Sequence, residues 1–227
     1  MKKVLQGCLG IAAAGLFATS ASANMLVNPS FEDAPFGGLE APVNDAAGWT
    51  SFGANFRIQC PTPGTACLEP IGEDTVGAFD GNVVNKNFGS SGVFQEFAAS
   101  EGQTWNGSVW ALNPDNGDQL VGAQVGLAIL SWRDAGGGEI SADVSNVLTE
   151  NSPVGMWELL SVSGTAPAGT ESVQFLLLAD FDVNAPEVGG APRWDAASLT
   201  VVPVPGALLL MGPALLGLAG MGRRKAA

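Results

Sequence analysis

The chain contains no histidine and no tyrosine among its 227 residues. Without histidine it cannot use a Ser-His-Asp or Cys-His arrangement, bind zinc through imidazole, or sense pH through that ring. It also has no dinucleotide-binding glycine fingerprint in a strand–turn–helix setting and no phosphate-binding loop. The glycosidase strand pattern E-x-D-x-x-E, which would mark two carboxylates for glycoside hydrolysis, is missing as well. We therefore expect a protein that is not an enzyme.

Positive charge is scarce, with nine Lys and Arg residues against 22 Asp and Glu residues. Five of the nine lie in the terminal segments: Lys2, Lys3, Arg223, Arg224 and Lys225. Only four cations remain in residues 24–202 against all 22 acidic residues, so the net charge of that part is −18. Such a surface repels nucleic acid and anionic lipid, and it suits divalent cations or a saline medium. Solubility alone is the competing interpretation.

The first 23 residues have the pattern of a secretory signal peptide. Lys2 and Lys3 precede a mostly apolar run at 4–18, and Ala21-Ser22-Ala23 forms a small-residue cleavage site. The run is too short to span a membrane permanently. A buried N-terminal helix would need a polar face, which this segment lacks. The pattern predicts an exported chain that begins at Asn24 after cleavage.

The other end carries an apolar run at 205–222. Eighteen residues of helix rise about 27 Å, which is enough for a hydrocarbon core of about 30 Å. The run is followed by Arg223, Arg224 and Lys225, a cluster that stays in the cytoplasm. We therefore predict a transmembrane helix over 205–222, with residues 24–202 on the outer side of the membrane.

A proline-containing motif, Val202-Pro203-Val204-Pro205, stands just before this run. Together with the apolar helix and the basic end, it resembles the PEP-CTERM sorting signal in its "VPxP" form. The resemblance covers residues 203–227 and implies a bacterium that makes exopolysaccharide. It also implies processing by an exosortase-type protease, after transient anchoring in the inner membrane. A plain anchor would not need the prolines, and a GPI signal does not end in a basic cluster.

Cys60 and Cys67 are the only cysteines of residues 24–202, and they flank a turn-rich stretch of proline, glycine and threonine. In an exported chain this arrangement predicts a disulfide.

The body of the chain reads as an all-β domain, because its apolar stretches are short and separated by Gly and Pro. At 104–112, a face with Trp105 and Val109 alternates with one that carries Ser108 and Trp110, as in a two-faced strand. The stretch at 134–139 predicts a hairpin turn. The predicted strands lie at 91–97, 104–112, 121–132, 157–165, 172–179 and 197–202.

Several phrases in this body resemble the carbohydrate-binding-module-like jelly rolls of the galactose-binding superfamily. They are, in order, Asn28-Pro29-Ser30-Phe31-Glu32, Gly48-Trp49-Thr50, Gln95-Glu96-Phe97, Glu101-Gly102-Gln103-Thr104-Trp105 and Trp194-Asp195-Ala196-Ala197-Ser198-Leu199. The series covers nearly all of residues 24–202. It implies a single jelly-roll β-sandwich whose first and last strands meet at one edge.

A structural calcium ion often occupies that edge in such domains. Glu32 matches the acidic position of the opening phrase and Asp195 that of the closing one, and Asp80 could supply a third carboxylate. Calcium prefers oxygen ligands of this kind. The second Asp of the closing phrase is replaced by Ala196. The alternative is that these carboxylates cap turns or are solvated.

Sugar rings stack on exposed aromatic faces, and Trp110 and Trp132 are the candidates for that role. The absence of tyrosine counts against glycan binding, and large aromatic residues are usually buried. Two functions are therefore expected. One is a non-catalytic protein that binds extracellular polysaccharide at the cell envelope. The other is a structural or adhesive acidic surface protein without sugar specificity.

Overall fold

The computed structural model describes residues 23–33, 40–42, 46–60, 66–67, 75–181, 184 and 188–202. The regular elements in these ranges are all β-strands, so the predicted all-β class is confirmed. The strands are β1 (Glu40–Pro42), β2 (Thr50–Gln59), β3 (Val83–Ala98), β4 (Thr104–Leu112), β5 (Val121–Gly122), β6 (Val125–Arg133), β7 (Glu139–Val144), β8 (Trp157–Thr165), β9 (Ser172–Asp180), β10 (Val188–Gly189) and β11 (Arg193–Val201).

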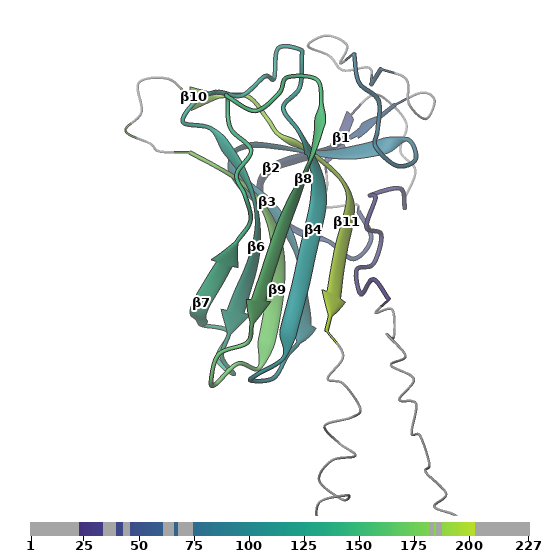
Figure 1. Ribbon diagram of the computed structural model, residues 1–227. Coiled ribbons are helices and arrows are strands. Elements are labelled where there is room, and N and C mark those ends of the chain that lie inside the picture. Colours follow the sequence, from purple (N-terminus) through teal and green to yellow (C-terminus); the bar gives the residue numbers. More distant parts are fainter. Residues whose placement is uncertain are drawn as a thin grey trace, which may run out of the picture.

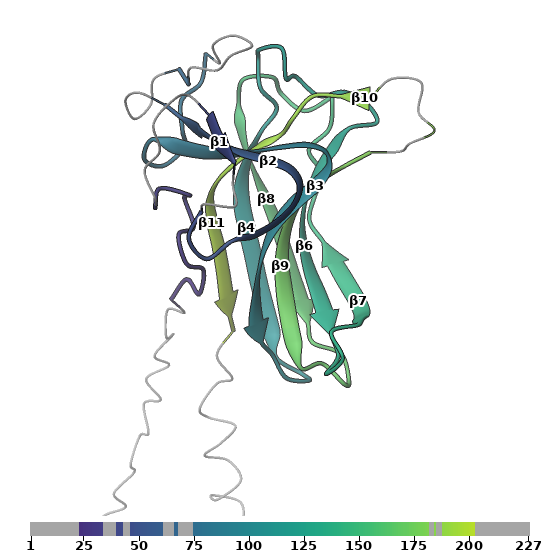
Figure 2. The ribbon, with the colours of Figure 1, turned by 180° about the vertical axis from the view of Figure 1, so that it is seen from behind.

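The strands form a sandwich of two layers, shown from opposite sides in Figures 1 and 2. One layer contains β11, β4 and β8, and the other contains β2, β3, β9, β6 and β7. All of the pairings between these strands are antiparallel. A small separate ribbon pairs β10 with β5. This two-layered arrangement is the jelly-roll type of sandwich that the sequence predicts.

The long strand β3 connects the two layers. Its first part pairs with β11 through Asn85 and Lys86, and its second part pairs with β9 from Ser91 onward. Between these parts, Gly89 has a φ of 62°, a left-handed conformation that glycine adopts without steric cost. The sheet therefore continues around one edge of the sandwich through a single strand.

The core lies between the layers and contains three fully buried tryptophans, Trp105, Trp132 and Trp194. The strand alternation predicted for 104–112 is confirmed, because Trp105 and Val109 are buried whereas Ser108 and Trp110 are only half-buried. Burying an aromatic side chain contributes about 1.5–3 kcal/mol relative to leaving it in water. These rings therefore supply much of the hydrophobic contribution that holds the layers together.

Most predicted strands are confirmed, and the differences have local causes. The ranges 104–112 and 157–165 coincide with β4 and β8. The range 121–132 is split into β5 and β6 by a turn in which the N–H of Gln124 donates to the carbonyl of Val121 (3.4 Å). The predicted hairpin turn joins β6 to β7, and the N–H of Asp134 donates to the carbonyl of Gly138 there (2.9 Å).

The terminal predictions lie outside the described residues. These are the signal peptide with Ala21, the transmembrane helix at 205–222, and the sorting residues Pro203, Val204, Pro205, Arg223, Arg224 and Lys225. Ala23 and Asn24 precede β1, and Val202 follows β11.

In the part of the chain that the structure describes, there is no helix with the length and hydrophobicity needed to cross a membrane.

Candidate functional site

A shallow groove of about 380 Å³ runs over the outward face of the β11, β4 and β8 layer. Each of the three strands contributes two small polar side chains to it. They are Asn106 and Ser108 from β4, Ser161 and Ser163 from β8, and Ser198 and Thr200 from β11. Every one of these side chains is uncharged, and together they offer hydroxyl and amide groups that can both donate and accept hydrogen bonds.

The strand register explains why these side chains meet. Ser108 is paired with Ser161 on one side and Ser198 on the other, and directly paired residues point to the same face. Asn106 is likewise paired with Ser163, whose hydroxyl donates to the side-chain oxygen Oδ1 of Asn106 (2.7 Å). The result is two rows of polar groups across three strands.

An aromatic cluster stands at one end of the groove. Trp110 follows Ser108 on the same face of β4, and the Phe79 ring stacks on it with centroids 4.1 Å apart and planes at 17°. Trp157 approaches Phe79 edge-on at 6.1 Å. Phe79 itself is 44% exposed and therefore presents the accessible ring of the cluster. Sequence reasoning identified Trp110 but missed Phe79, although the turn that contains Phe79 was visible as Phe-Asp-Gly-Asn.

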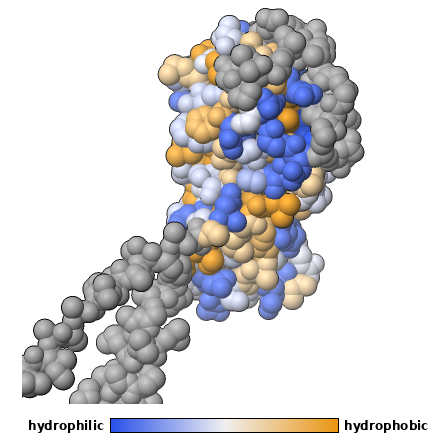
Figure 3. All heavy atoms as spheres, turned by 90° about the vertical axis from the view of Figure 1, so that its right-hand side faces the viewer, coloured by the Kyte–Doolittle hydropathy of each residue, from blue (hydrophilic) through white to orange (hydrophobic). Residues whose placement is uncertain are grey.

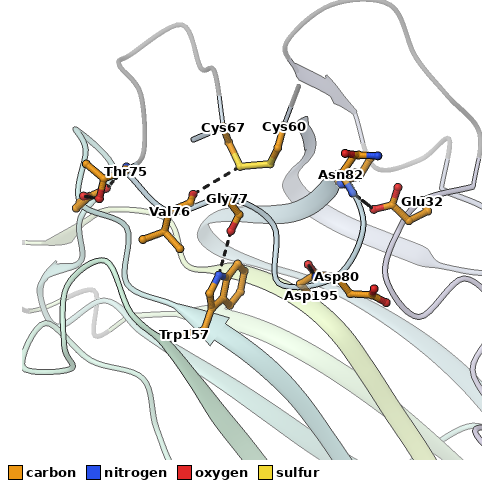
Figure 4. The surroundings of a disulfide bond; sticks show 12 residues. Glu32, Cys60, Cys67, Thr75, Val76, Gly77, Asp80, Asn82, Trp157 and Asp195 are labelled. Carbon is orange, nitrogen blue, oxygen red and sulfur yellow. Dashed lines mark hydrogen bonds between the residues drawn. A yellow bond between two sulfur atoms is a disulfide. The ribbon is translucent and has the colours of Figure 1, made fainter. Parts of the chain in front are cut away.

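Phe79 belongs to a segment, residues 75–82, that we call the cap segment. Its first residue donates a backbone hydrogen bond to Asp115 (Thr75 N to Oδ1, 2.8 Å), and its third accepts one from Trp157 (Nε1 to the Gly77 carbonyl, 3.1 Å). Figure 4 shows the contact between Trp157 and Gly77 beside the disulfide. Several widely separated parts of the chain therefore hold the cap segment over the layer.

The predicted disulfide between Cys60 and Cys67 is confirmed and lies next to the cap segment. Cys67 Sγ contacts the carbonyl oxygen of Val76 (3.8 Å), and both cysteines pack in a small buried cluster with Ile58 and Ala78. This second cluster is separate from the main core. The disulfide thus supports the cap segment from the side opposite Trp157, as Figure 4 shows.

Asp80 of the cap segment and Asp195 of β11, two of the predicted ligands, come together (Figure 4). The backbone N–H of Asp80 donates to Asp195 Oδ2 (2.8 Å), and the N–H of Ala196 donates to Oδ1 (2.6 Å). Asp195 is fully buried, and burial together with the nearby Asp80 charge raises its pKa to about 8, against the lowering effect of these hydrogen bonds.

The third predicted ligand, Glu32, contacts the same turn from another direction. Its Oε1 accepts hydrogen bonds from the backbone N–H groups of Asn82 and Val83, both at 2.7 Å. The side-chain oxygen of Asn82 is buried and has no hydrogen-bond partner. Glu32 therefore caps this turn, as the alternative interpretation of the sequence expected.

These oxygen donors have the chemistry that calcium prefers. Among the described residues, however, no three Asp, Glu, His or Cys side chains form a group that could hold a metal ion. The structure thus brings Asp80 to Asp195 and leaves Glu32 on the other side of the turn. The donors fit a calcium ion chemically, and their described arrangement is that of a hydrogen-bonded turn.

The prediction that Trp132 is an exposed sugar-stacking residue is wrong. Its side chain is only 1% exposed, lies in the main core, and donates through Nε1 to Asp143 Oδ2 (2.8 Å). The reason is the alternation of β6, which turns Trp132 inward with Ala128 and Leu130. The neighbouring Arg133 is half-buried and points to the opposite face.

Comparisons with known proteins identify the fold. No protein-family model matches the chain, and no curated protein matches it in sequence. A cyclase from Fischerella sp. TAU, in complex with 4-(1H-indol-3-yl)butan-2-one, matches with a TM-score of 0.55 and 14% identity over 81% of this chain and 99% of that one. TmCBM61 in complex with β-1,4-galactotriose has a TM-score of 0.46 and 17% identity, covering 78% of this chain and 98% of that one. The xylan-binding domain CBM22-1 from Paenibacillus barcinonensis has a TM-score of 0.44 and 15% identity, covering 73% and 94%. The chain is similar to the cyclase in its jelly-roll fold.

Proposed function

We propose that the protein is an exported, non-catalytic domain that binds glycans through the groove and the adjoining Phe79 ring. The observation that carries this proposal is the stacked Phe79–Trp110 pair at the end of a groove lined with hydroxyl and amide groups. Aromatic rings offer flat apolar faces, and a pyranose ring has a matching face of C–H groups. The groove side chains can then pair with the sugar hydroxyls.

The pairing of an apolar platform with a few polar groups is what ligand sites generally use to fix orientation. Here Trp110 supports Phe79 from below, so the exposed ring is held at one angle and loses little freedom on binding. Ser163 and Asn106 are already joined by a hydrogen bond, which fixes both side chains before a ligand arrives. These features favour binding.

The proposal also includes export and sorting. The basic n-region with the Ala23–Asn24 cleavage site, and the Val202-Pro203-Val204-Pro205 motif with its basic end, support secretion followed by exosortase processing. The domain would then be delivered to the cell envelope or the extracellular matrix. There its partner would be the polysaccharide that the cell itself produces.

A structural calcium ion is part of the same proposal. Asp80 and Asp195 would hold it, and the buried oxygen of Asn82 lies in the same turn. The ion would supply positive charge to the Asp195 carboxylate, which is expensive to ionise in its buried position.

The first test is affinity electrophoresis of the full-length protein, kept in a non-ionic detergent, through gels that contain the producing cell's polysaccharide. We expect Phe79→Ala to lose most of the retardation that the unchanged protein shows. Phe52→Ala is the matched control, because Phe52 is 42% exposed but belongs to the other layer.

Equal retardation of the Phe79→Ala variant and the unchanged protein would exclude this site. Unretarded migration of all three proteins would favour the alternative function, a structural or adhesive acidic surface protein.

A further inference from the structure

The surface of residues 24–202 carries almost no positive charge. Only four Lys and Arg residues occur in this range. Three of them are buried: Arg57 is 1% exposed, Lys86 2% and Arg193 0%. Lys86 and Arg193 both form ion pairs with Asp118, at 2.9 and 3.0 Å. Three of the four cationic side chains of this domain therefore lie in its interior and not on its surface.

The fourth cation lies away from the groove. Arg133 belongs to β6 in the other layer, where it donates hydrogen bonds to the Gly137 carbonyl (2.9 Å) and to Gln174 Oε1 (2.9 Å). The groove itself is lined only by uncharged residues, which include Gly107 and Val162 beside the polar side chains. No cationic residue of the range 24–202 is therefore placed to pair with a negatively charged sugar in the groove.

Long-range electrostatics act in the same direction. A domain with a net charge of −18 repels a polyanion over roughly one Debye length, about 8 Å at physiological ionic strength. Binding an acidic polysaccharide would also remove water from its carboxylates or sulfates without supplying a charged partner. Neutral sugars are not repelled and have no charged groups to desolvate. Their hydroxyl groups can form hydrogen bonds with the serine, threonine and asparagine side chains of the groove.

We infer that the groove selects uncharged polysaccharide chains and excludes polymers rich in uronic acid or sulfate. This inference rests on the proposed glycan-binding function and adds to it the class of glycan.

Figure 3 shows one further side of the body, on which hydrophilic areas lie above and below a hydrophobic area.

The test separates the producing cell's polysaccharide into neutral and acidic fractions on an anion exchanger. Full-length protein in non-ionic detergent is run through gels that contain either fraction, with a chelator present so that calcium cannot bridge two anions. We expect retardation by the neutral fraction alone. We also expect the acidic fraction to retard the protein once its carboxyl groups have been chemically reduced to alcohols.

Two charge variants locate the effect. Ser161→Lys adds a cation inside the groove, and Ser141→Lys adds the same charge at an exposed serine of β7 in the other layer. We expect Ser161→Lys to gain retardation by the acidic fraction, up to about fivefold, since exposed ion pairs contribute only modestly. Ser141→Lys should gain clearly less.

The possible outcomes distinguish glycan binding itself from selectivity for neutral glycans. Retardation of the unchanged protein by the acidic fraction, with the chelator present, would overturn the selectivity and leave glycan binding intact. An equal gain in retardation for both lysine variants would show that overall charge, and not the groove, determines which polysaccharide binds. That result would also overturn the proposed selectivity of the groove. Unretarded migration in every gel would remove the proposed function, and the selectivity with it.

Discussion

The two outward faces of the sandwich differ sharply in chemistry although both alternate with buried core residues. On β4, β8 and β11 the outward side chains are hydroxyl and amide groups that line the groove. On β3, β9 and β6 the outward positions hold Phe94, Leu127, Ile129, Leu176 and Leu178, all half-buried. The inner faces of both layers, by contrast, are predominantly apolar, although the buried Gln95 of β3 also points inward.

This comparison separates two kinds of constraint on the sequence. The inward residues have to fill a shared core, so both layers use large apolar side chains there. The outward residues have no such common requirement, and the two layers have diverged into a polar face with a groove and an aliphatic face. The groove face joins rows of hydroxyl and amide groups on three strands to the exposed Phe79 ring, which is why we assign binding to it.

The largest expected effect of a single substitution comes from breaking the core that both faces share. Trp132→Ala should lower the free energy of unfolding by about 3–5 kcal/mol, because it leaves a cavity in the main core and removes the partner of Asp143. Chemical denaturation measures the change, with Trp132→Phe as the milder control. If the Trp132→Ala protein is still folded but is no longer retarded by glycan, Trp132 contacts sugar in spite of its burial.

The next effect concerns a charge beneath the groove face. Asp195 has a pKa of about 8 in the folded protein, whereas its ordinary value of 3.8 applies in the unfolded chain. The stabilising contribution of its bound proton is complete below about pH 4 and is lost as the pH rises through about 8. The free energy of unfolding should therefore fall by up to about 1.4 kcal/mol per pH unit between these limits.

The variant Asp195→Asn isolates this contribution, because it cannot lose the proton. Subtracting its pH profile from that of the unchanged protein, measured in a chelator, should leave the predicted slope. Added calcium should flatten the slope if the ion binds the charged carboxylate. A flat difference profile in the chelator would contradict the buried, protonated state of Asp195.

A smaller effect is expected at the disulfide, which lies beside the cap segment. Replacing Cys60 and Cys67 by serine should cost about 2–3 kcal/mol, given the sequence separation of 7. The cap segment, which carries Phe79, loses its neighbour at Val76, so glycan retardation should weaken as well. Thermal unfolding with and without reductant measures the first effect, and the double variant itself should not respond to reductant. Undiminished retardation in the folded variant would show that the cap segment is held without the disulfide.

The smallest effect is a change confined to the aliphatic face. A Cβ at Gly92 would lie 2.8 Å from both Leu176 Cδ1 and Phe52 Cζ, so Gly92→Ala should destabilise the protein by about 1–3 kcal/mol. Its retardation in glycan gels should not change, since the groove lies in the other layer. Gly189→Ala is the control, because nothing lies within 4 Å of its added Cβ. Weaker retardation of the folded Gly92→Ala protein would show that the two faces are coupled.

Much of the fold could be predicted from local patterns. The alternation at 104–112 correctly placed Trp105 and Trp110 on opposite faces of one strand, because side-chain direction in a strand follows a period of two. The hairpin turn at 134–139 and the disulfide could also be recognised, since each involves residues close in sequence. The strand β2 was missed, because its alternation is weak and its outer part carries Gly53 and Asn55.

The candidate site was predicted only in part, for a different reason. Trp132 was misplaced because the sequence shows which residues alternate but not which face a strand turns toward the core. Phe79 was missed because its importance comes from contact with Trp110, which lies 31 positions later in the sequence. The serines of the groove are unremarkable in sequence and become a set only through the register of three strands.

The sequence by itself determined the strand-forming character of this protein, its strongly acidic balance and its local cross-link. These depend on composition and on contacts between near neighbours. The tertiary structure decided which tryptophans are buried, which ring covers Trp110, and how Asp80 meets Asp195 across 115 positions of sequence. Such contacts are made by packing two layers against each other, and their geometry is fixed only when the whole core is assembled.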